Sequence, residues 1–255
     1  MYLLPETELI KITSKSADGN AATFVIEPLS PGYGVTVGNA LRRVMLASLE
    51  GSAVSSVKID GVNHEFTSLE NMREDIVEFI LNLKGLPVRM QTDDPTTITL
   101  DVKGPKNVTA KDIRLSSDVE IIDPNYPLAT LIKGGSLKAE IVIEKGRGFV
   151  PSEKKTEEKT PLGTVMLDST YTPIKKVHYE VENTRVGSIT NFDKLTFDIT
   201  TNGSISPNEA IKNACQILID HFSLITTDIP DTEKQAPKAK KKTTKAKKTV
   251  KKNKK

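Results

Sequence analysis

Residues 31–49, PGYGVTVGNALRRVMLASL, join a glycine-rich turn to a helix, and this segment restricts the possible folds more than any other. From Val37 to Leu49 the apolar residues recur every three or four positions, which places them on one side of a helix. Arg42 and Arg43 border that apolar stripe. Apolar residues beside arginine are enriched at protein–protein contacts. The helix is therefore either a core helix with arginines on its surface or part of an interface.

The same segment allows a second interpretation, because Gly32, Gly34 and Gly38 follow an apolar run and open a helix. In dinucleotide-binding turns, glycines at such positions let a pyrophosphate approach the helix N-terminus. An acidic residue, Asp60, also follows a later strand-like run, as in that motif. However, mostly strands follow Asp60, whereas the dinucleotide-binding fold alternates strands and helices. A nucleotide-binding oxidoreductase that uses the glycine turn remains the alternative function.

The charge of the chain is divided along its length. The formal net charge is +3, with 36 Lys and Arg against 33 Asp and Glu. Residues 234–255 hold 12 lysines and no acid, which leaves a net charge of −9 in residues 1–233. An acidic body is not the electrostatic footprint of a DNA-binding domain. We expect residues 229–255 to be disordered, either as a solvated tail that aids solubility or, as we favour, as a segment that holds DNA phosphates without reading bases. The lysines expected to do so include Lys240, Lys241, Lys242, Lys247 and Lys248.

No combination of residues in the sequence predicts catalysis or metal binding. The histidines are far apart in sequence, and Cys215 is the only cysteine, which excludes an intrachain disulfide and a cysteine-built zinc site. A nucleophile elbow, a P-loop and an acidic metal cluster are all absent from the sequence. There is neither a signal peptide nor an apolar run long enough to cross a bilayer, so we expect a cytoplasmic protein without a membrane partner. These features indicate a binding or assembly protein.

Hydropathy patterns predict three helices among many strands. The helices span about 31–49, 71–85 and 206–222, and the strands span 54–59, 97–102, 119–122, 137–144, 174–182 and 195–200. Asn71 with Glu74, and Ser206 with Glu209, are spaced as capping boxes at the start of the second and third helices. Residues 145–163 are expected to be an irregular exposed stretch. The third helix is apolar on more than one side, so it is either central to the core or buried by a partner, and together with the first helix it suggests a dimer interface.

Six long stretches of the chain lie within about residues 1–228: FVIEPLSPGYGVTVGNALRRVMLASLEGSAV, SVKIDGVNHEF, EDIVEFILNLKGL, GRGFVP, PIKKVHYEVENTRVG and DKLTFDITTNGSISPNEAI. In their sequence and their order they resemble the alpha-subunit family of bacterial RNA polymerase. The resemblance implies an α+β chain with two lobes. Residues 1–50 and 172–228 would form a dimerisation lobe of antiparallel strands and two helices, and residues 51–171 would form an inserted, mainly-β lobe.

The resemblance also implies a function. In this family a homodimer of alpha subunits is the platform on which the large beta and beta-prime subunits assemble, as part of a nucleoid-associated enzyme. Nucleotide addition and its magnesium belong to the large subunits, so this chain would carry no catalytic residue, metal or cofactor. Family members continue into a small helical domain that binds upstream promoter DNA. We expect this chain to lack that domain, because only the Lys-rich run follows Ile229.

Site residues follow from the family's motifs. The assembly-critical second arginine of the first helix corresponds to Arg43, the main expected contact to beta. Weaker candidates for large-subunit contact are Arg42, Lys84, Lys175 and Arg185. The expected dimer interface comprises Val37, Leu41, Val44, Met45, Ile211, Cys215, Leu218 and Phe222.

Overall fold

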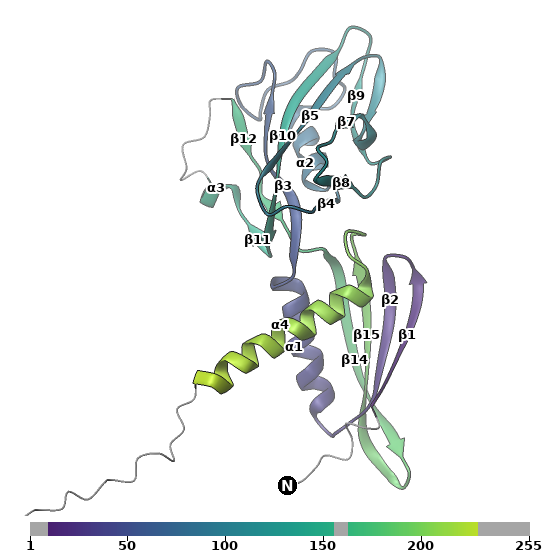
Figure 1. The fold of residues 1–255 in the computed structure, drawn as a ribbon. Coiled ribbons are helices and arrows are strands. Elements are labelled where there is room, and N and C mark those ends of the chain that lie inside the picture. The colour runs from purple at the N-terminus through teal and green to yellow at the C-terminus, as the bar shows by residue number, and fades with distance from the viewer. Residues whose placement is uncertain (1–9, 156–162, 229–255) are drawn as a thin grey trace, which may run out of the picture. The chain divides into compact units, whose positions relative to one another are not determined.

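The computed structural model of the 255-residue chain describes residues 10–155 and 163–228 (Figure 1). By compactness the chain divides into two units, residues 1–219 and 220–255. The first unit contains two hydrophobic cores, each built on a sheet. The Lys-rich run, with its five candidate DNA-contact lysines, lies outside the described residues.

A four-stranded antiparallel sheet forms one core, and we call this part the four-stranded lobe. The strand order is β1 (Lys11–Asp18), β2 (Ala21–Leu29), β15 (Ile189–Thr201) and β14 (Ile174–Val186). Helix α1 (Tyr33–Ala47) and the first half of α4 (Pro207–Asp228) contribute to its core. Phe24 lies opposite Phe197 in the strand register, and Phe197 and Met45 are completely buried. The chain reaches this core twice, through residues 22–49 and again through residues 174–214.

Seven antiparallel strands form the second core, which we call the seven-stranded lobe. Along the sheet lie β7 (Ile113–Arg114), β5 (Thr96–Lys103), β10 (Ser136–Arg147), β3 (Glu50–Ile59), β4 (Val88–Met90) and β8 (Val119–Ile121), with β12 (Thr164–Met166) also paired to β3. Residues of β10 alternate between buried Leu137, Ala139 and Ile141 and exposed Lys138 and Glu140. Helix α2 (Ile76–Lys84) contributes its buried side to the core.

Smaller elements complete the seven-stranded lobe. Strand β6 (Lys106–Thr109) pairs with β9 (Pro127–Leu131), and β11 (Phe149–Val150) pairs with β13 (Ser169–Thr170). A 3-10 turn, η1, spans Ala110–Asp112, and a short helix, α3, spans Ser152–Lys155. All strand pairs in the described residues are antiparallel. The α+β class predicted from sequence is confirmed.

Predicted and observed helices differ most at α2. The sequence placed its start at Asn71, but the helix begins at Ile76, with Asp75 as N-cap accepting a hydrogen bond from the Glu78 N–H at 2.7 Å. Asn71 has a left-handed backbone with φ of 62°. The Glu74 carboxylate accepts a hydrogen bond from the Thr130 N–H of β9 instead, at 2.6 Å. The predicted capping box at α2 is therefore wrong.

Helix α4 starts as predicted. The Ser206 N–H donates to the Glu209 carboxylate at 3.0 Å, and the Ser206 hydroxyl accepts from the Glu209 N–H at 3.3 Å, which is a complete capping box. The helix continues to Asp228, beyond the predicted end at Phe222. The stretch expected to be irregular, 145–163, contains the end of β10, β11 and α3, and its residues 156–162 lie outside the described ranges.

Candidate functional site

The N-terminus of α1 is closed by a carboxylate of the chain itself. Asp193 on β15 is buried, and its Oδ2 accepts hydrogen bonds from the N–H groups of Gly32 and Gly34, each at 2.9 Å. A phosphate bound at a helix N-terminus would use these donors. It would have to displace Asp193 and would be repelled by its charge. The nucleotide-binding interpretation therefore has no support in this geometry.

Gly34 and Gly38 allow α1 to pack closely against the β14–β15 hairpin. A Cβ on Gly34 would lie 2.7 Å from Cγ1 of Val181, and a Cβ on Gly38 would lie 2.7 Å from Cδ2 of Tyr179. Both distances are far below the 3.5–4.0 Å at which carbon atoms attract each other. The glycine spacing that resembled a nucleotide motif is thus a packing requirement of the four-stranded lobe.

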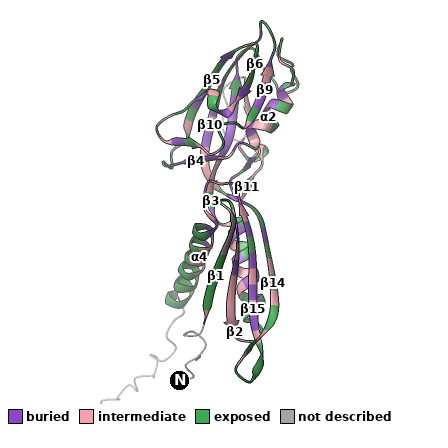
Figure 2. Cartoon of the chain, turned by 90° about the vertical axis from the view of Figure 1, so that its right-hand side faces the viewer, coloured by how far each residue is buried: buried purple, intermediate pink, exposed green. Residues whose placement is uncertain are grey.

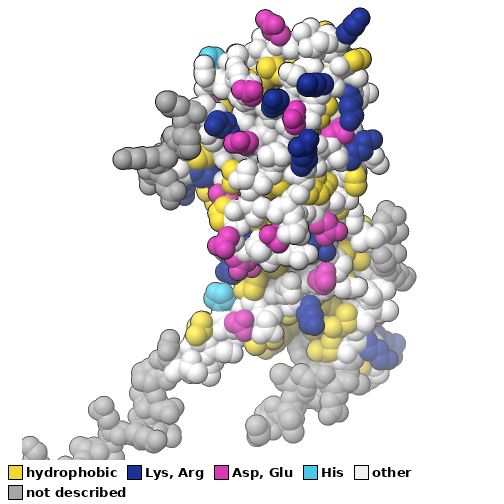
Figure 3. All heavy atoms as spheres, turned by 45° about the horizontal axis from the view of Figure 1, so that its top comes forward, with side chains coloured by type: hydrophobic (Ala, Val, Ile, Leu, Met, Phe, Trp, Pro, Cys, Tyr) yellow, Lys and Arg dark blue, Asp and Glu magenta, His cyan; other side chains and the backbone are white. Residues whose placement is uncertain are grey.

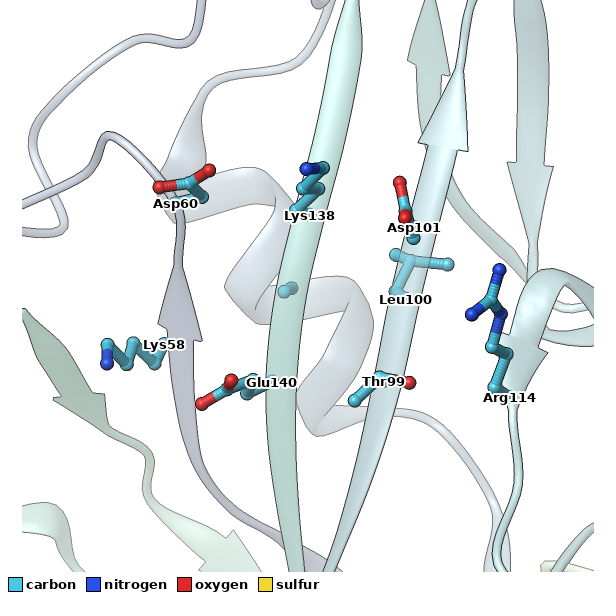
Figure 4. Close-up of a pocket in the computed structure, with 9 residues that line it drawn as sticks. Lys58, Asp60, Thr99, Leu100, Asp101, Arg114, Lys138 and Glu140 are labelled. Atoms are coloured by element: carbon cyan, nitrogen blue, oxygen red, sulfur yellow. The ribbon is translucent and has the colours of Figure 1, made fainter.

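Asp60, the acidic residue of the nucleotide interpretation, lines a hollow of about 330 Å³ on the outer face of the seven-stranded sheet (Figure 4). The other charged residues around it are Lys58, Asp101, Arg114, Lys138 and Glu140. These six described side chains form no ion pair with one another. Figure 3 shows basic and acidic side chains mixed over a wider surface. Such a mixture is typical of the solvated face of an antiparallel sheet.

Arg42 and Arg43 lie on the outer side of α1 and are both exposed. Among the described residues, neither guanidinium has an ion pair or a hydrogen bond. Arg43 lines an open hollow of about 680 Å³ together with Val35, Asn39 and Leu218, whereas Arg42 does not line it. A guanidinium fork beside an apolar hollow can bind a carboxylate or backbone carbonyls of another protein.

The predicted dimer residues divide into three groups. Leu41 and Met45 are enclosed in the core of their own lobe, with 3% and 0% exposure, so they offer no surface to a second copy. This part of the interface prediction is corrected, because an amphipathic stripe also arises from packing within one chain. Half-buried residues at the edge of the core are Val37, Val44, Ile211, Cys215 and Leu218. Phe222 is 62% exposed.

Other large apolar side chains are exposed on the same two helices. On α1 they are Tyr33, Val35 and Leu46, and on α4 they are Ile219, Leu224 and Ile225. Figure 2 shows the outer part of α4 as mostly exposed. Large contiguous apolar patches are typical of surfaces that bind another molecule. Burial raises the pKa of the Cys215 thiol, which disfavours the reactive thiolate form.

Lys84 lies at the end of α2, in a third hollow. Its amine donates to the Asp168 carboxylate at 3.1 Å and lies 5.9 Å from the centre of the Phe149 ring. Hydrogen bonds from the Ser152 N–H and from the Lys84 amine lower the pKa of Asp168. The hollow measures about 290 Å³, and exposed Phe66 and Leu81 lie along it. This site on the seven-stranded lobe combines apolar rings with a partly exposed cation.

The structure does not bring Lys175 and Arg185 together. Both are exposed residues of β14, and the ten-residue separation corresponds to about 30 Å along a strand. The Arg185 side chain donates to the Gly187 carbonyl at the hairpin turn, at 2.8 Å. These two residues thus belong to opposite ends of one strand rather than to a single site.

Sequence reasoning did not identify Asp193. A signal for it exists, because Asp193 has the same parity along the strand as Leu195, Phe197 and Ile199, which all face the core. A carboxylate at a core-facing strand position requires a hydrogen-bond partner. The pattern could not say that the partner is the start of α1.

No metal site and no membrane-spanning helix occur in the part of the chain that the structure describes. Within residues 10–155 and 163–228, no three His, Cys, Asp or Glu side chains are grouped to hold a metal ion. The helices of these ranges are too short or too polar to cross a membrane.

Comparison with known proteins relates the chain to a polymerase subunit. Residues 57–172 match the family model described as the RNA polymerase Rpb3/RpoA insert domain. The chain is 46% identical over 231 residues to the DNA-directed RNA polymerase subunit alpha of Clostridium botulinum strain Eklund 17B / Type B, and equally to that of strain Alaska E43 / Type E3. Each alignment covers 89% of this chain and 73% of the relative. Neither comparison supports an oxidoreductase.

Proposed function

The chain belongs to the alpha-subunit family of bacterial DNA-directed RNA polymerase, and on this basis we propose that two copies of it form the platform on which the large beta and beta-prime subunits assemble. It is a subunit of a nucleotidyltransferase complex. Nucleotide addition, with its magnesium, takes place in the large subunits, and the complex works in the cytoplasm. This chain contributes contact surfaces rather than reacting groups.

One observation carries the proposed contact to beta. Arg43 is an exposed cation without a described partner, beside a hollow of about 680 Å³ that an apolar side chain can enter. At protein interfaces, arginine beside such a hollow is a typical hot spot. The hollow at Lys84 is proposed as a further contact to a large subunit because it combines exposed apolar side chains with a cation.

Co-purification tests the contact to beta. The tagged chain is expressed with the two large polymerase subunits of its own genome, and the amount of each captured subunit is measured. Loss of a hot-spot arginine costs about 2 kcal/mol or more, so Arg43→Ala lowers capture at limiting concentration by about 30-fold. Arg42→Ala is the comparison, with the same charge on the same helix but outside the hollow, and lowers it less. Equal effects of the two substitutions would refute the special role of Arg43.

The homodimer is proposed on the exposed apolar residues of α1 and α4. Ile219, Phe222 and Ile225 follow one another every three residues, which keeps them on one side of α4. Phe222→Glu places a charge there and shifts the native mass from a dimer toward the 27.9 kDa monomer. Asn213→Glu adds the same charge on an exposed residue of α4 about 180° around the helix from Phe222, and leaves the dimer intact. A dimer unaffected by Phe222→Glu would contradict this interface.

The Lys-rich run is proposed to hold DNA without base recognition. Its 12 lysines attract phosphates, and each neutralised phosphate releases counterions. Replacing Lys240, Lys241, Lys242, Lys247 and Lys248 with glutamine would lower the salt dependence of duplex binding by up to about 4.5 in log–log slope. Fluorescence anisotropy of labelled DNA at several salt concentrations measures this slope. An unchanged slope would show that these lysines do not contact the phosphates.

A further inference from the structure

Helix α1 lacks the groups that usually complete a helix start. Its N-cap is Gly32, with φ of 86°, which has no side chain to accept a hydrogen bond. The first turn also contains no acidic residue. The first N–H groups of a helix have no partner within the helix and need an acceptor from elsewhere. The start of α1 therefore depends on a residue distant in sequence.

Asp193 supplies that acceptor from β15. One carboxylate oxygen receives both the Gly32 and the Gly34 N–H groups at 2.9 Å, although about 160 residues separate them in the chain. Asp193 is only 7% exposed, so little water competes for these bonds. Its negative charge also interacts favourably with the positive end of the helix dipole. The carboxylate thus determines where along the sheet α1 begins.

Two glycines then determine how α1 is rotated about its own axis. Gly34 and Gly38 lie one turn apart and face Val181 and Tyr179 of the hairpin so closely that neither position has room for a Cβ. Leu41, three residues after Gly38 and therefore on the same side of the helix, is also buried. With this side turned to the sheet, Arg43 is exposed to solvent.

We propose that Asp193 is a positioning residue for polymerase assembly, which anchors the start of α1 and thereby presents Arg43 to the large subunit. This inference rests on the proposed function of Arg43. Asp193 itself is buried and need not touch the partner. Its effect is transmitted through the register and rotation of one helix.

Amide hydrogen exchange tests the anchor without any large subunit. In the full chain labelled with ¹⁵N-glycine, Asp193→Ala leaves the Gly34 N–H without its acceptor and speeds its exchange about tenfold. Asp193→Asn keeps an acceptor oxygen of the same length and retains most of the protection. Asp198→Ala is the matched control, an exposed carboxylate on the same strand that accepts from the Thr23 hydroxyl instead. Unchanged Gly34 exchange in Asp193→Ala would overturn the anchor.

Capture of the large subunits tests the consequence. Asp193→Ala lowers capture about fivefold or more, whereas Asp193→Asn and Asp198→Ala stay within about twofold of the parent chain. Faster Gly34 exchange with undiminished capture would overturn the role in assembly. If Asp193→Ala does not fold, Asp193→Asn decides alone: protected Gly34 with normal capture supports the proposal, and protected Gly34 with lost capture overturns it. Failure of the parent chain to capture any large subunit would refute the proposed function itself, while the exchange data still decide on the anchor.

Discussion

Replacing Gly38 with alanine tests the packing of α1, because the substitution has two opposing effects of known size on the free energy of unfolding. Alanine is favoured over glycine inside a helix by about 1 kcal/mol. Against this, the new Cβ would lie 2.7 and 2.9 Å from two ring atoms of Tyr179 and 3.1 Å from Leu195. Tyr179 cannot move away freely, since its ring packs on Phe197 with centroids 5.9 Å apart. Overpacking of this kind costs about 1–3 kcal/mol, so Gly38→Ala lowers the free energy of unfolding by about 1 kcal/mol.

A second background isolates the contact with Tyr179. In a Tyr179→Ala chain the clash with the ring is absent and the helix preference of alanine remains, so Gly38→Ala becomes neutral or stabilising there. Urea unfolding followed by circular dichroism measures all four chains at one fixed concentration, because self-association changes the apparent stability. If Gly38→Ala stabilised the parent chain, or changed both backgrounds equally, the packing explanation of the glycine would be refuted.

Three further predictions concern stability. Lys155 donates hydrogen bonds to three oxygen atoms from a half-buried position, so Lys155→Ala lowers the free energy of unfolding by about 1–3 kcal/mol. The control is Lys154→Ala at the exposed neighbouring residue, which changes the free energy of unfolding little. Equal effects of the two substitutions would contradict this prediction. The pKa of Asp168 is lowered in the folded chain, so its stabilisation is complete above the ordinary value of 3.8 and is lost as the pH falls through the folded value. In Asp168→Asn the urea midpoint therefore changes less between pH 6 and about pH 3 than it does in the parent chain. The same pH dependence in both chains would contradict this prediction. Ser206→Ala removes half of the capping box with Glu209 and lowers the free energy of unfolding, measured with urea, by about 1 kcal/mol. An unchanged free energy of unfolding would contradict this prediction.

Local signals made parts of the fold predictable from sequence. The start of α4 could be placed correctly because Ser206 and Glu209 satisfy each other within one turn. The start of α2 could not, although Asn71 and Glu74 have the same spacing. Glu74 hydrogen-bonds to Thr130 of β9, a contact between residues far apart in the chain. A capping pattern therefore predicts a helix start only when no distant partner competes for the side chain.

The glycine turn shows the same limit at the candidate site. Its sequence fits both a phosphate-binding turn and a closely packed helix start. Asp193, far along the chain, decides between them by occupying the donors of Gly32 and Gly34. Similarly, an apolar stripe could not distinguish Met45, buried in its own lobe, from the half-buried Val44. An apolar helix face has the same periodicity in the sequence whether its own chain or a partner buries it.

Arg43 is exposed, which the proposed contact to beta requires. The structure adds the hollow beside Arg43, which distinguishes this arginine from Arg42. It also separates the other candidates, since Lys84 lies in the seven-stranded lobe and Lys175 and Arg185 lie on β14. The spacing of these residues in the sequence does not reveal how far apart they lie in the fold.

The central claim is that two copies of this chain carry the two large subunits, and native mass spectrometry tests it most directly. The complex is purified through a tag on this chain after expression with the large subunits of its own genome. We predict one assembly that contains two copies of the 27.9 kDa chain and one copy of each large subunit. An assembly with a single copy, or a chain that is recovered without the large subunits, would contradict the account.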